Sequence, residues 1–367
     1  MEYKPLGSMV KRKISYGIVQ PGRSVPDGIP VIKVNNLISG LNSPSELDTT
    51  ARQNETKYAR TRLHGGELII SVVGTIGKTA IIPESFAGCN LVRATALIDI
   101  EDTLLTKWVK YYIESPNGQS YIEKNLNTTV QPTLNIKSLV EMPIPLFEAT
   151  TIEKIVLFLS SLDEKIKVNK RVNDNLEQQA QAVYASMFID NADPAWVQGH
   201  LSDLITVKYG KDHKKLANGS YPVYGSGGIM RYVERPLYDK ESVLIPRKGT
   251  LNNVMYVNQP FWSVDTMFYT EMRLPNVAKF VYHFVKAKDL ASMNAGSAVP
   301  SMTTDILNAM EVTIPSASVL EEFESLVAPM YRAMQENDIQ SSKLSELRDA
   351  LLPKLMSGEI DVSDIRL

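Results

Sequence analysis

The hydrophobic pattern of this chain contains two ladders of residues that alternate steps of three and four. The first ladder consists of Ile152, Ile155, Leu159, Leu162, Ile166, Asn169, Asn173, Leu176, Ala180, Val183 and Met187. Adding 168 to each number gives the second ladder: Leu320, Phe323, Val327, Met330, Met334, Asn337, Ser341, Leu344, Arg348, Leu351 and Leu355. Both follow the heptad spacing of helices that pack along one seam, and both become polar at the same central positions. The pattern predicts two long helices that are copies of one another.

A similar series of landmarks precedes each ladder. Short β-branched runs over 29–34 and 68–73 predict strands, and the pattern of 105–115 predicts a helix. The matching landmarks are Tyr16-Gly17 with Tyr209-Gly210, Pro30-Val31 with Pro222-Val223, and Gly74-Thr75 with Gly249-Thr250. We therefore expect an α+β protein in which two mixed α/β domains and two long helices form an internal repeat.

The positions of breaks in the pattern predict the domain boundaries. Ser160 and Ser161 followed by Asp163 and Glu164 give capping-box chemistry, and Pro329 stands at the place of Ser161, where the first turn of a helix tolerates proline. We expect a short helix on each domain before each long helix. The predicted parts are a first domain over 1–147, a first helical region over 148–189 with its long helix at 161–188, a second domain over 190–316, and a second helical region over 317–367 with its long helix at 329–356.

A helix with apolar residues on only two of seven positions needs a partner helix, and the nearest candidate is the other copy. The predicted core of the pair is Ile166, Asn169, Asn173, Leu176, Met334, Asn337, Ser341 and Leu344. Antiparallel packing would place Asn173 beside Asn337 and Asn169 beside Ser341, whereas parallel packing would pair Asn169 with Asn337. The order of the domains favours an antiparallel coiled coil with a pseudo-twofold axis, because that arrangement places the two domains at opposite ends.

Length and composition set limits on the class of protein. A chain of 367 residues can bury two cores of ordinary domain size. No apolar run is long enough to cross a membrane, the first residues lack the character of a signal peptide, and the single Cys89 excludes internal disulfides and cysteine-rich zinc sites. We expect a cytoplasmic protein.

The charges are distributed unevenly, although the formal net charge is only −2. Residues 1–80 contain 11 Lys and Arg against 6 Asp and Glu, and residues 199–262 contain 9 against 5. Residues 317–367 contain 5 against 10. The opening part of each domain is therefore suited to a nucleic acid and the second helical region to a protein partner.

The turn Gly74 to Thr79 resembles a phosphate loop, but a Walker motif needs glycine where Val72 stands, so ATP binding is not expected. Such a turn still exposes backbone N–H groups that suit a phosphate of a nucleic-acid backbone. Amide and lysine side chains suit base edges, and the glycine-rich loop 225–228 lets backbone approach a partner closely. The candidate DNA-binding residues are Lys11, Arg12, Lys33, Asn35, Asn36, Thr75, Lys78, Lys211, Lys214, Tyr224, Ser226, Arg247, Lys248, Thr250 and Asn252.

No catalytic site can be assembled from the sequence. The four histidines, His64, His200, His213 and His283, are scattered without the spacing of a metal pair or a catalytic triad. We expect a chain that has no catalytic residues and binds no metal or cofactor.

The motifs of this chain resemble those of the specificity subunits of type I restriction-modification systems. The resemblance is most specific in 159–166, continuing to Asn169 and Leu176, and in 351–360. The turn 69–78 and the run 221–228 are similar to recurrent pieces of the target-recognition domains of that family. The resemblance covers nearly the whole chain.

The resemblance implies a non-enzymatic role, in which each target-recognition domain reads one half of a bipartite, asymmetric sequence in double-stranded DNA. It also implies that the helices dock two methyltransferase subunits and that translocase/nuclease subunits join them. S-adenosylmethionine, ATP and Mg are then expected on those partners. A ruler of roughly 40 Å between the domains is close to one turn of B-DNA.

Two alternatives stay open at the level of sequence. The chain could be the recognition subunit of a two-chain system whose fused methyltransferase-nuclease cuts on both sides of its site, which only neighbouring genes would distinguish. It could also be a coiled-coil scaffold that joins two protein-binding domains, which predicts that no DNA fragment is retained even when a methyltransferase is supplied.

Overall fold

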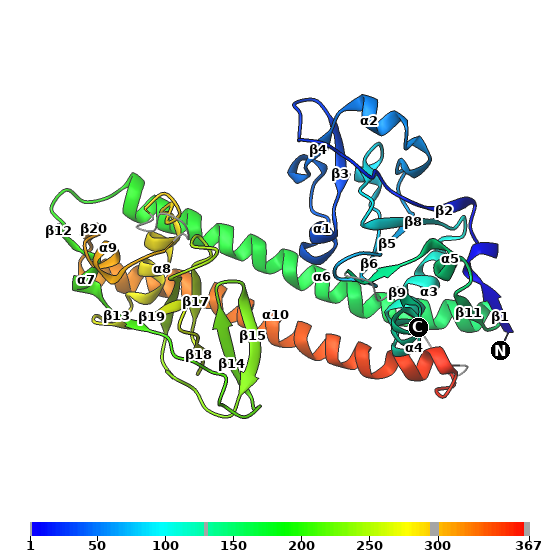
Figure 1. Ribbon diagram of the computed structural model, residues 1–367. Helices are drawn as coiled ribbons and strands as arrows, with labels where there is room; N and C mark the ends of the chain where they lie inside the picture. The colour runs from blue at the N-terminus through cyan, green and yellow to red at the C-terminus, as the bar shows by residue number, and fades with distance from the viewer. Residues whose placement is uncertain (1, 128–130, 294–300, 363–367) are drawn as a thin grey trace. The chain divides into compact units, whose positions relative to one another are not determined.

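The computed structural model describes residues 2–127, 131–293 and 301–362 (Figure 1). The chain forms two compact units: unit 1 comprises residues 1–168 and 340–367, and unit 2 comprises residues 169–339. Each unit contains one mixed α/β domain and a segment of each long helix. The predicted domain limits at 147, 189 and 316 stay predictions, and residues 363–367 of the predicted second helical region lie outside the described part.

The domain of unit 1 is built on an antiparallel four-stranded sheet with the order β2-β8-β5-β6. A second sheet has the order β4-β3-β7, in which β3 and β7 are parallel. The strands are β1 (Glu2–Pro5), β2 (Arg12–Tyr16), β3 (Ile29–Ile32), β4 (Thr49–Thr50), β5 (Leu68–Ser71), β6 (Thr79–Ile81), β7 (Asn90–Leu91), β8 (Thr95–Asp99), β9 (Leu126–Asn127), β10 (Thr133–Leu134) and β11 (Pro143–Leu146). The α-helices are α1 (Val34–Ser39), α2 (Arg52–Thr56), α3 (Thr103–Glu114), α4 (Pro116–Lys124) and α5 (Ile136–Val140).

The domain of unit 2 repeats this topology. Its four-stranded sheet has the order β13-β19-β16-β17, and its three-stranded sheet has the order β15-β14-β18 with β14 and β18 parallel. The strands are β12 (Val197–His200), β13 (Ile205–Tyr209), β14 (Tyr221–Gly225), β15 (Gly228–Val233), β16 (Ser242–Pro246), β17 (Met255–Val257), β18 (Trp262–Ser263), β19 (Met267–Met272) and β20 (Glu311–Ile314). The α-helices are α7 (Leu201–Leu204), α8 (Ala278–Lys286) and α9 (Thr304–Asn308).

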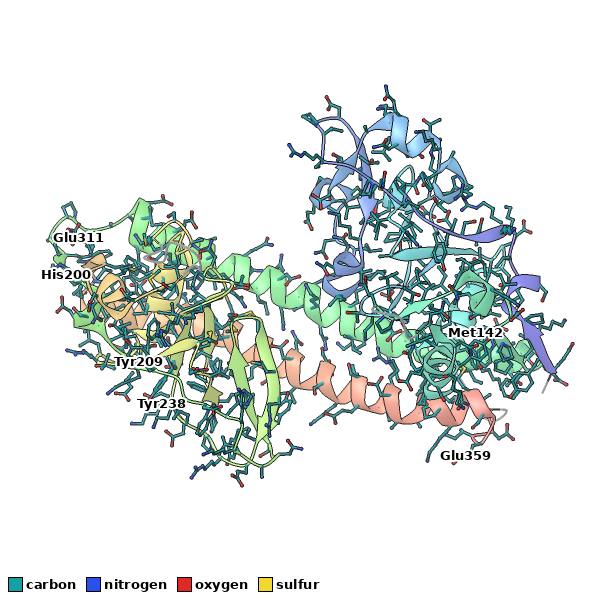
Figure 2. The ribbon with its side chains drawn as sticks, viewed as in Figure 1. Met142, His200, Tyr209, Tyr238, Glu311 and Glu359 are labelled. Carbon is teal, nitrogen blue, oxygen red and sulfur yellow. The ribbon has the colours of Figure 1, made fainter. Side chains whose placement is uncertain are left out.

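Equivalent hydrogen bonds in the two units confirm the internal repeat. The Leu134 N–H donates to the Val72 carbonyl at 2.9 Å, and the Met302 N–H donates to the Arg247 carbonyl at 2.9 Å. Val72 and Arg247 therefore occupy the same place, two residues before the two Gly-Thr pairs. The paired terminal strands also match, β1 with β11 in unit 1 and β12 with β20 in unit 2, where His200 faces Glu311 (Figure 2).

The paired glycines Gly17 and Gly210 stand where the backbone approaches another strand too closely for a side chain. A Cβ atom on Gly17 would lie 2.2 Å from the Leu91 carbonyl oxygen, and one on Gly210 would lie 2.0 Å from the Val264 carbonyl oxygen. Glycine is therefore required at both landmarks for packing, independently of any partner.

The predicted starts of the long helices at 161 and 329 are wrong. Helix α6 is continuous over Ala149–Ala185 and is followed by a π-helical turn, Ser186–Asp190, while α10 is continuous over Ala317–Ser357. Ser161 bonds within the helix, where its hydroxyl donates to the Phe158 carbonyl at 2.7 Å. Pro329 removes one helical hydrogen bond, but buried residues on both sides of it, such as Val327 and Tyr331, keep the helix packed on the core of unit 2.

The two helices are antiparallel in both units, as predicted. In unit 2 the Tyr184 and Phe323 rings lie 6.2 Å apart, and Asn173, earlier in α6, bonds to Asn337, later in α10, at 2.8 Å. In unit 1 Arg348 of α10 donates to Asp163 of α6 at 2.8 Å, and Lys154, earlier in α6, donates to the Val362 carbonyl, beyond the end of α10, at 3.2 Å. The predicted pairing of Asn173 with Asn337 is confirmed, and the pairing of Asn169 with Ser341 stays a prediction.

Replacing Asn337 with alanine is expected to destabilise unit 2 by about 1–2 kcal/mol, because the side-chain oxygen Oδ1 of Asn173 loses the Asn337 amide donor in the helix seam. Leucine at both 173 and 337 is expected to restore or exceed the original stability, since a well-packed apolar pair often replaces a buried polar pair without loss. Chemical denaturation measures both effects. Asn175→Ala, at an exposed position of α6, is the control and should leave the midpoint unchanged.

Candidate nucleic-acid interface

The predicted Gly-Thr turn of unit 1 connects β5 to β6, and the buried Ser71 fixes its shape. The Ser71 hydroxyl donates to the Thr75 carbonyl at 2.5 Å and accepts from the Lys78 N–H at 2.9 Å, while the Gly77 N–H donates to the Ser71 carbonyl at 2.9 Å. Gly74 and Gly77 have φ values of +78° and +84°, which favour glycine. The turn is therefore ordered before any ligand binds.

This turn contains backbone hydrogen-bond donors that a ligand could use. Within the part of the chain that the structure describes, the successive N–H groups of Gly74, Thr75 and Ile76 have no hydrogen-bond acceptor. The side chains of Thr75 and Lys78 are exposed beside them. Backbone donors, a hydroxyl and an ammonium group in one exposed turn are suited to bind a phosphate.

The equivalent turn of unit 2 has the same character with different side chains. The N–H groups of Gly249, Thr250 and Leu251 likewise have no acceptor among the described residues. Lys248 and Thr250 are exposed, and the Arg247 guanidinium lies over the Tyr209 ring, 5.3 Å from its centroid. Because Arg247 replaces Val72 of unit 1, the two turns share donors but differ in charge.

Arg12 has a structural role within the domain of unit 1, and its predicted contact with DNA stays a prediction. Its guanidinium bonds to Asp99, to the Arg62 carbonyl at 2.8 Å and to Glu67 at 2.6 Å. Glu67 is buried and also accepts from the His64 and Gly65 N–H groups at 2.7 and 2.8 Å. Arg12 therefore neutralises a buried carboxylate within the domain, because an unpaired charge there would be costly.

Three other candidates have structural roles that sequence reasoning missed. Tyr224 is only 9% exposed and packs edge-on against Phe261, so that it belongs to the core of unit 2. The Asn36 side chain accepts from the Lys33 N–H at 2.8 Å and caps α1. The Asn252 side chain donates to Asp289 and accepts from the Ala291 N–H, both at 3.0 Å, and so holds the segment after α8.

The remaining candidates lie at the surface. Lys11 pairs with Glu101 at 3.8 Å, and Lys33 pairs with Asp48, both as exposed ion pairs that contribute little to stability. The side chains of Asn35, Lys211 and Lys214 are exposed, and Ser226 is half-buried with its carbonyl accepting from Asn253 at 2.8 Å. The signal for Ser71 was present in the sequence, as the one polar residue inside the apolar run 68–73 before Gly74.

The described ranges of the chain contain neither a cluster of metal ligands nor a membrane-spanning helix. No group of three or more His, Cys, Asp or Glu side chains there is placed to hold a metal ion. None of the helices in these ranges combines the length and apolar character that a membrane span requires.

Comparison with known proteins places these features in a family. The model of the type I restriction modification DNA specificity domain matches residues 20–178 and, a second time, residues 195–322. Similar proteins include the specificity subunit of the type I restriction enzyme EcoBI of Escherichia coli, with 26% identity over 195 residues that cover 51% of this chain and 40% of the relative. The MjaIX specificity subunit of Methanocaldococcus jannaschii is 22% identical over 308 residues, covering 72% of this chain and 71% of the relative.

A solved structure shares the fold. The S subunit of a type I restriction-modification system from M. genitalium is 18% identical, with a TM-score of 0.57 over 96% of this chain and 95% of that one. The chain thus covers 95% of this solved structure, whereas its match covers only 40% of the length of the EcoBI specificity subunit.

Proposed function

Since the chain belongs to the family of type I restriction modification DNA specificity domains, we propose that it binds double-stranded DNA and determines which sequence a restriction-modification complex recognises. Each domain reads one half of a bipartite, asymmetric target. The observation that carries this proposal is the pair of Gly-Thr turns, which present the same backbone donors to a phosphate in two domains whose surrounding side chains differ.

The chain itself supplies recognition and no catalytic residue. Two methyltransferase subunits dock on the helical regions, and translocase/nuclease subunits complete the assembly, so that S-adenosylmethionine, ATP and Mg belong to those partners. The acidic balance of 317–367, with 5 basic against 10 acidic residues, supports a protein partner rather than DNA on this part of the chain. The fold and the family match support the order of the parts.

Replacing Lys78 with alanine is expected to weaken binding to a DNA duplex about tenfold and to lower the slope of log K against log salt by about 0.9, the effect of one lost phosphate contact. Lys248→Ala should do the same in unit 2. Since phosphate contacts carry no sequence information, the methylated motif should stay unchanged in both variants. Titrations of the assembly with its methyltransferase at several salt concentrations, together with genome-wide mapping of methylated adenines, measure these effects.

Lys167→Ala, at an exposed position of α6, is the control and should leave the salt slope unchanged. A change of the motif on one side only is expected from replacing Asn35, which is exposed on α1. Methylation of a continuous palindromic sequence, or no methylation that depends on this chain, would contradict the proposed function.

A further inference from the structure

Side-chain hydrogen bonds attach the Gly-Thr turn of unit 1 to helices α3 and α4. The Thr79 hydroxyl donates to Glu114 of α3 at 2.6 Å, one residue beyond Lys78. Gln119 of α4 bonds to the Ile113 carbonyl at 2.7 Å and, more weakly, to the Gly77 carbonyl at 3.4 Å. These contacts hold the end of the turn that carries the exposed lysine.

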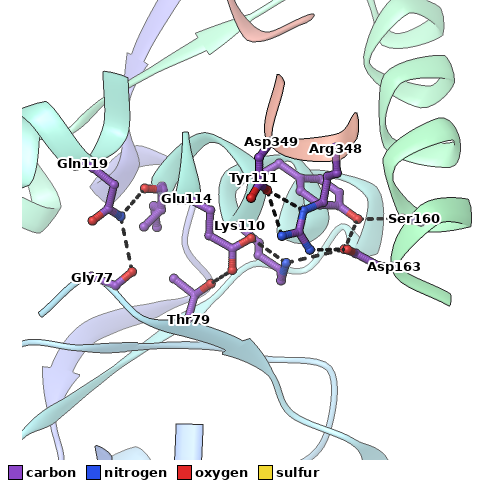
Figure 3. A network of polar contacts seen from close by, with 11 residues as sticks. Gly77, Thr79, Lys110, Tyr111, Glu114, Gln119, Ser160, Asp163, Arg348 and Asp349 are labelled. Carbon is purple, nitrogen blue, oxygen red and sulfur yellow. Dashed lines mark hydrogen bonds and ion pairs between the residues drawn. The ribbon is translucent and has the colours of Figure 1, made fainter. Parts of the chain in front are cut away.

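The same carboxylate begins a series of polar contacts that reaches both long helices (Figure 3). Lys110 pairs with Glu114 at 2.7 Å and with Asp163 of α6 at 3.8 Å. Asp163 accepts from the Tyr111 hydroxyl at 2.8 Å and from Arg348 of α10 at 2.8 Å. We call Thr79, Glu114, Lys110, Asp163 and Arg348 the turn network.

Four residues of the turn network, Thr79, Lys110, Glu114 and Arg348, line a cavity of about 370 Å³ together with Lys78. Arg348 and Asp163 are each 28% exposed, so that their pairing is partly shielded from water. Burial lowers the pKa of Arg348, but its hydrogen bonds to Asp163 and Asp349 outweigh this effect and raise the pKa above its usual value. Arg348 therefore stays protonated near pH 7.

Unit 2 lacks such a continuous connection within its described residues. There Glu177 of α6 accepts from Tyr282 and Lys286 of α8, and His283 bonds to Gln181 at 2.8 Å and to Tyr331 at 2.9 Å. Burial lowers the pKa of His283 to about 4, so that the imidazole is neutral near pH 7. Among the described residues, this group joins α8 to the long helices without a hydrogen bond to the turn. The turn is held instead by the side chains of Asn252 and Asn253.

We propose that the turn network positions the Gly-Thr turn of unit 1 for a DNA phosphate. The same network links that contact to the arrangement of the two long helices, α6 and α10. Glu114, Lys110 and Asp163 are positioning residues that act through Lys78 and the backbone donors of the turn. The inference rests on the proposed function of DNA binding. A polar network with fixed geometry suits this role, since ion pairs with satisfied hydrogen bonds specify one arrangement even where they add little stability.

A double-mutant cycle between the network and the turn tests the inference. Asp163→Asn keeps the shape of the side chain but removes the charge that holds Lys110 and Arg348. The probe is a DNA duplex that carries the methylated motif, titrated with the assembly of this chain and its methyltransferase. Asp163→Asn is expected to weaken binding about fivefold and Lys78→Ala about tenfold, while the double variant stays near tenfold, because residues in one network are not additive.

Lys286→Ala is the matched control, because it removes an ion pair between a domain helix and α6 in unit 2. The fold-loss of DNA affinity in the double variant Lys286→Ala and Lys78→Ala should equal the product of the two single losses. If Asp163→Asn destabilises the fold, Thr79→Val serves in its place, since it removes only the bond to Glu114. The inference would be overturned if the loss of affinity in the double variant equalled the product of the two single losses. This holds for Lys78→Ala combined with Asp163→Asn and for Lys78→Ala combined with Thr79→Val.

Two different results would contradict DNA recognition and the positioning role of the turn network. Failure of the unmodified assembly to bind any duplex would contradict DNA recognition itself. Normal binding that weakens with Lys78→Ala, together with a salt slope that Asp163→Asn does not alter, would contradict only the positioning role.

Discussion

Replacing Leu355 with alanine is expected to destabilise unit 1 by about 2–4 kcal/mol, although the residue lies near the end of the chain. Leu355 is 2% exposed and belongs to the same apolar core as Ile152, Leu159 and Trp108. The deletion leaves a cavity among side chains that come from the first domain and from both long helices. Equilibrium unfolding with urea measures the loss.

The location of the effect is as informative as its size. Hydrogen exchange should show faster opening of amides in β5 and α3, whereas β16 and α8 of unit 2 keep their protection. Leu347→Ala is the control on the same helix, since Leu347 is 45% exposed and its truncation should change stability by less than about 0.5 kcal/mol. Equal loss of protection in both units would contradict the assignment of Leu355 to the core of unit 1.

Replacing Gly210 with alanine is expected to destabilise unit 2 by about 3 kcal/mol or more, because the new Cβ atom meets backbone that cannot move aside. The nearest atoms are the Val264 carbonyl oxygen at 2.0 Å and the Ser263 carbonyl oxygen at 2.6 Å. The connection from β13 must then separate from β18, where Lys211 N–H also donates to the Ser263 carbonyl at 2.8 Å. Thermal unfolding of the purified protein measures the effect.

Gly17→Ala should have an effect of similar size in unit 1, where the Cβ atom would lie 2.2 Å from the Leu91 carbonyl oxygen. Gly227→Ala provides the contrast, since nothing lies within 4 Å of its Cβ position. A neutral result for Gly210→Ala would mean that the backbone at this crossing is looser than the structure shows.

The sequence predicted the repeat, the strand that enters the Gly74-Thr75 turn and the antiparallel helix pair, because these depend on local periodicity and on residues such as Gly17 and Asn173. The breaks at 161 and 329 were wrong, since local capping signals in Ser161 and Pro329 were outweighed by burial of the residues around them. Tertiary packing determines where these helices begin, and a local sequence pattern does not contain that information.

The predicted contacts with DNA stay predictions, but the structure shows which of the candidate side chains are exposed and which are held by other residues. Lys78 and Thr75 lie in an exposed turn, as expected. Arg12 and Tyr224 carry suitable chemistry but are held by Glu67 and Phe261, which are remote in sequence. The type of a residue shows which contacts its side chain can make. Whether the side chain is free to contact DNA depends on the residues that the fold packs against it.

Unit 1 is assembled from two segments separated by the whole of unit 2. During translation the nascent chain can complete unit 2 as soon as residues 169–339 have left the ribosome, whereas unit 1 still lacks Leu352, Leu355, Met356 and Val362 at that stage. The usual order of cotranslational folding, in which the N-terminal domain matures first, is thereby reversed. The apolar residues of the first domain that pack with these four side chains therefore stay exposed until residues 352–362 have been synthesised.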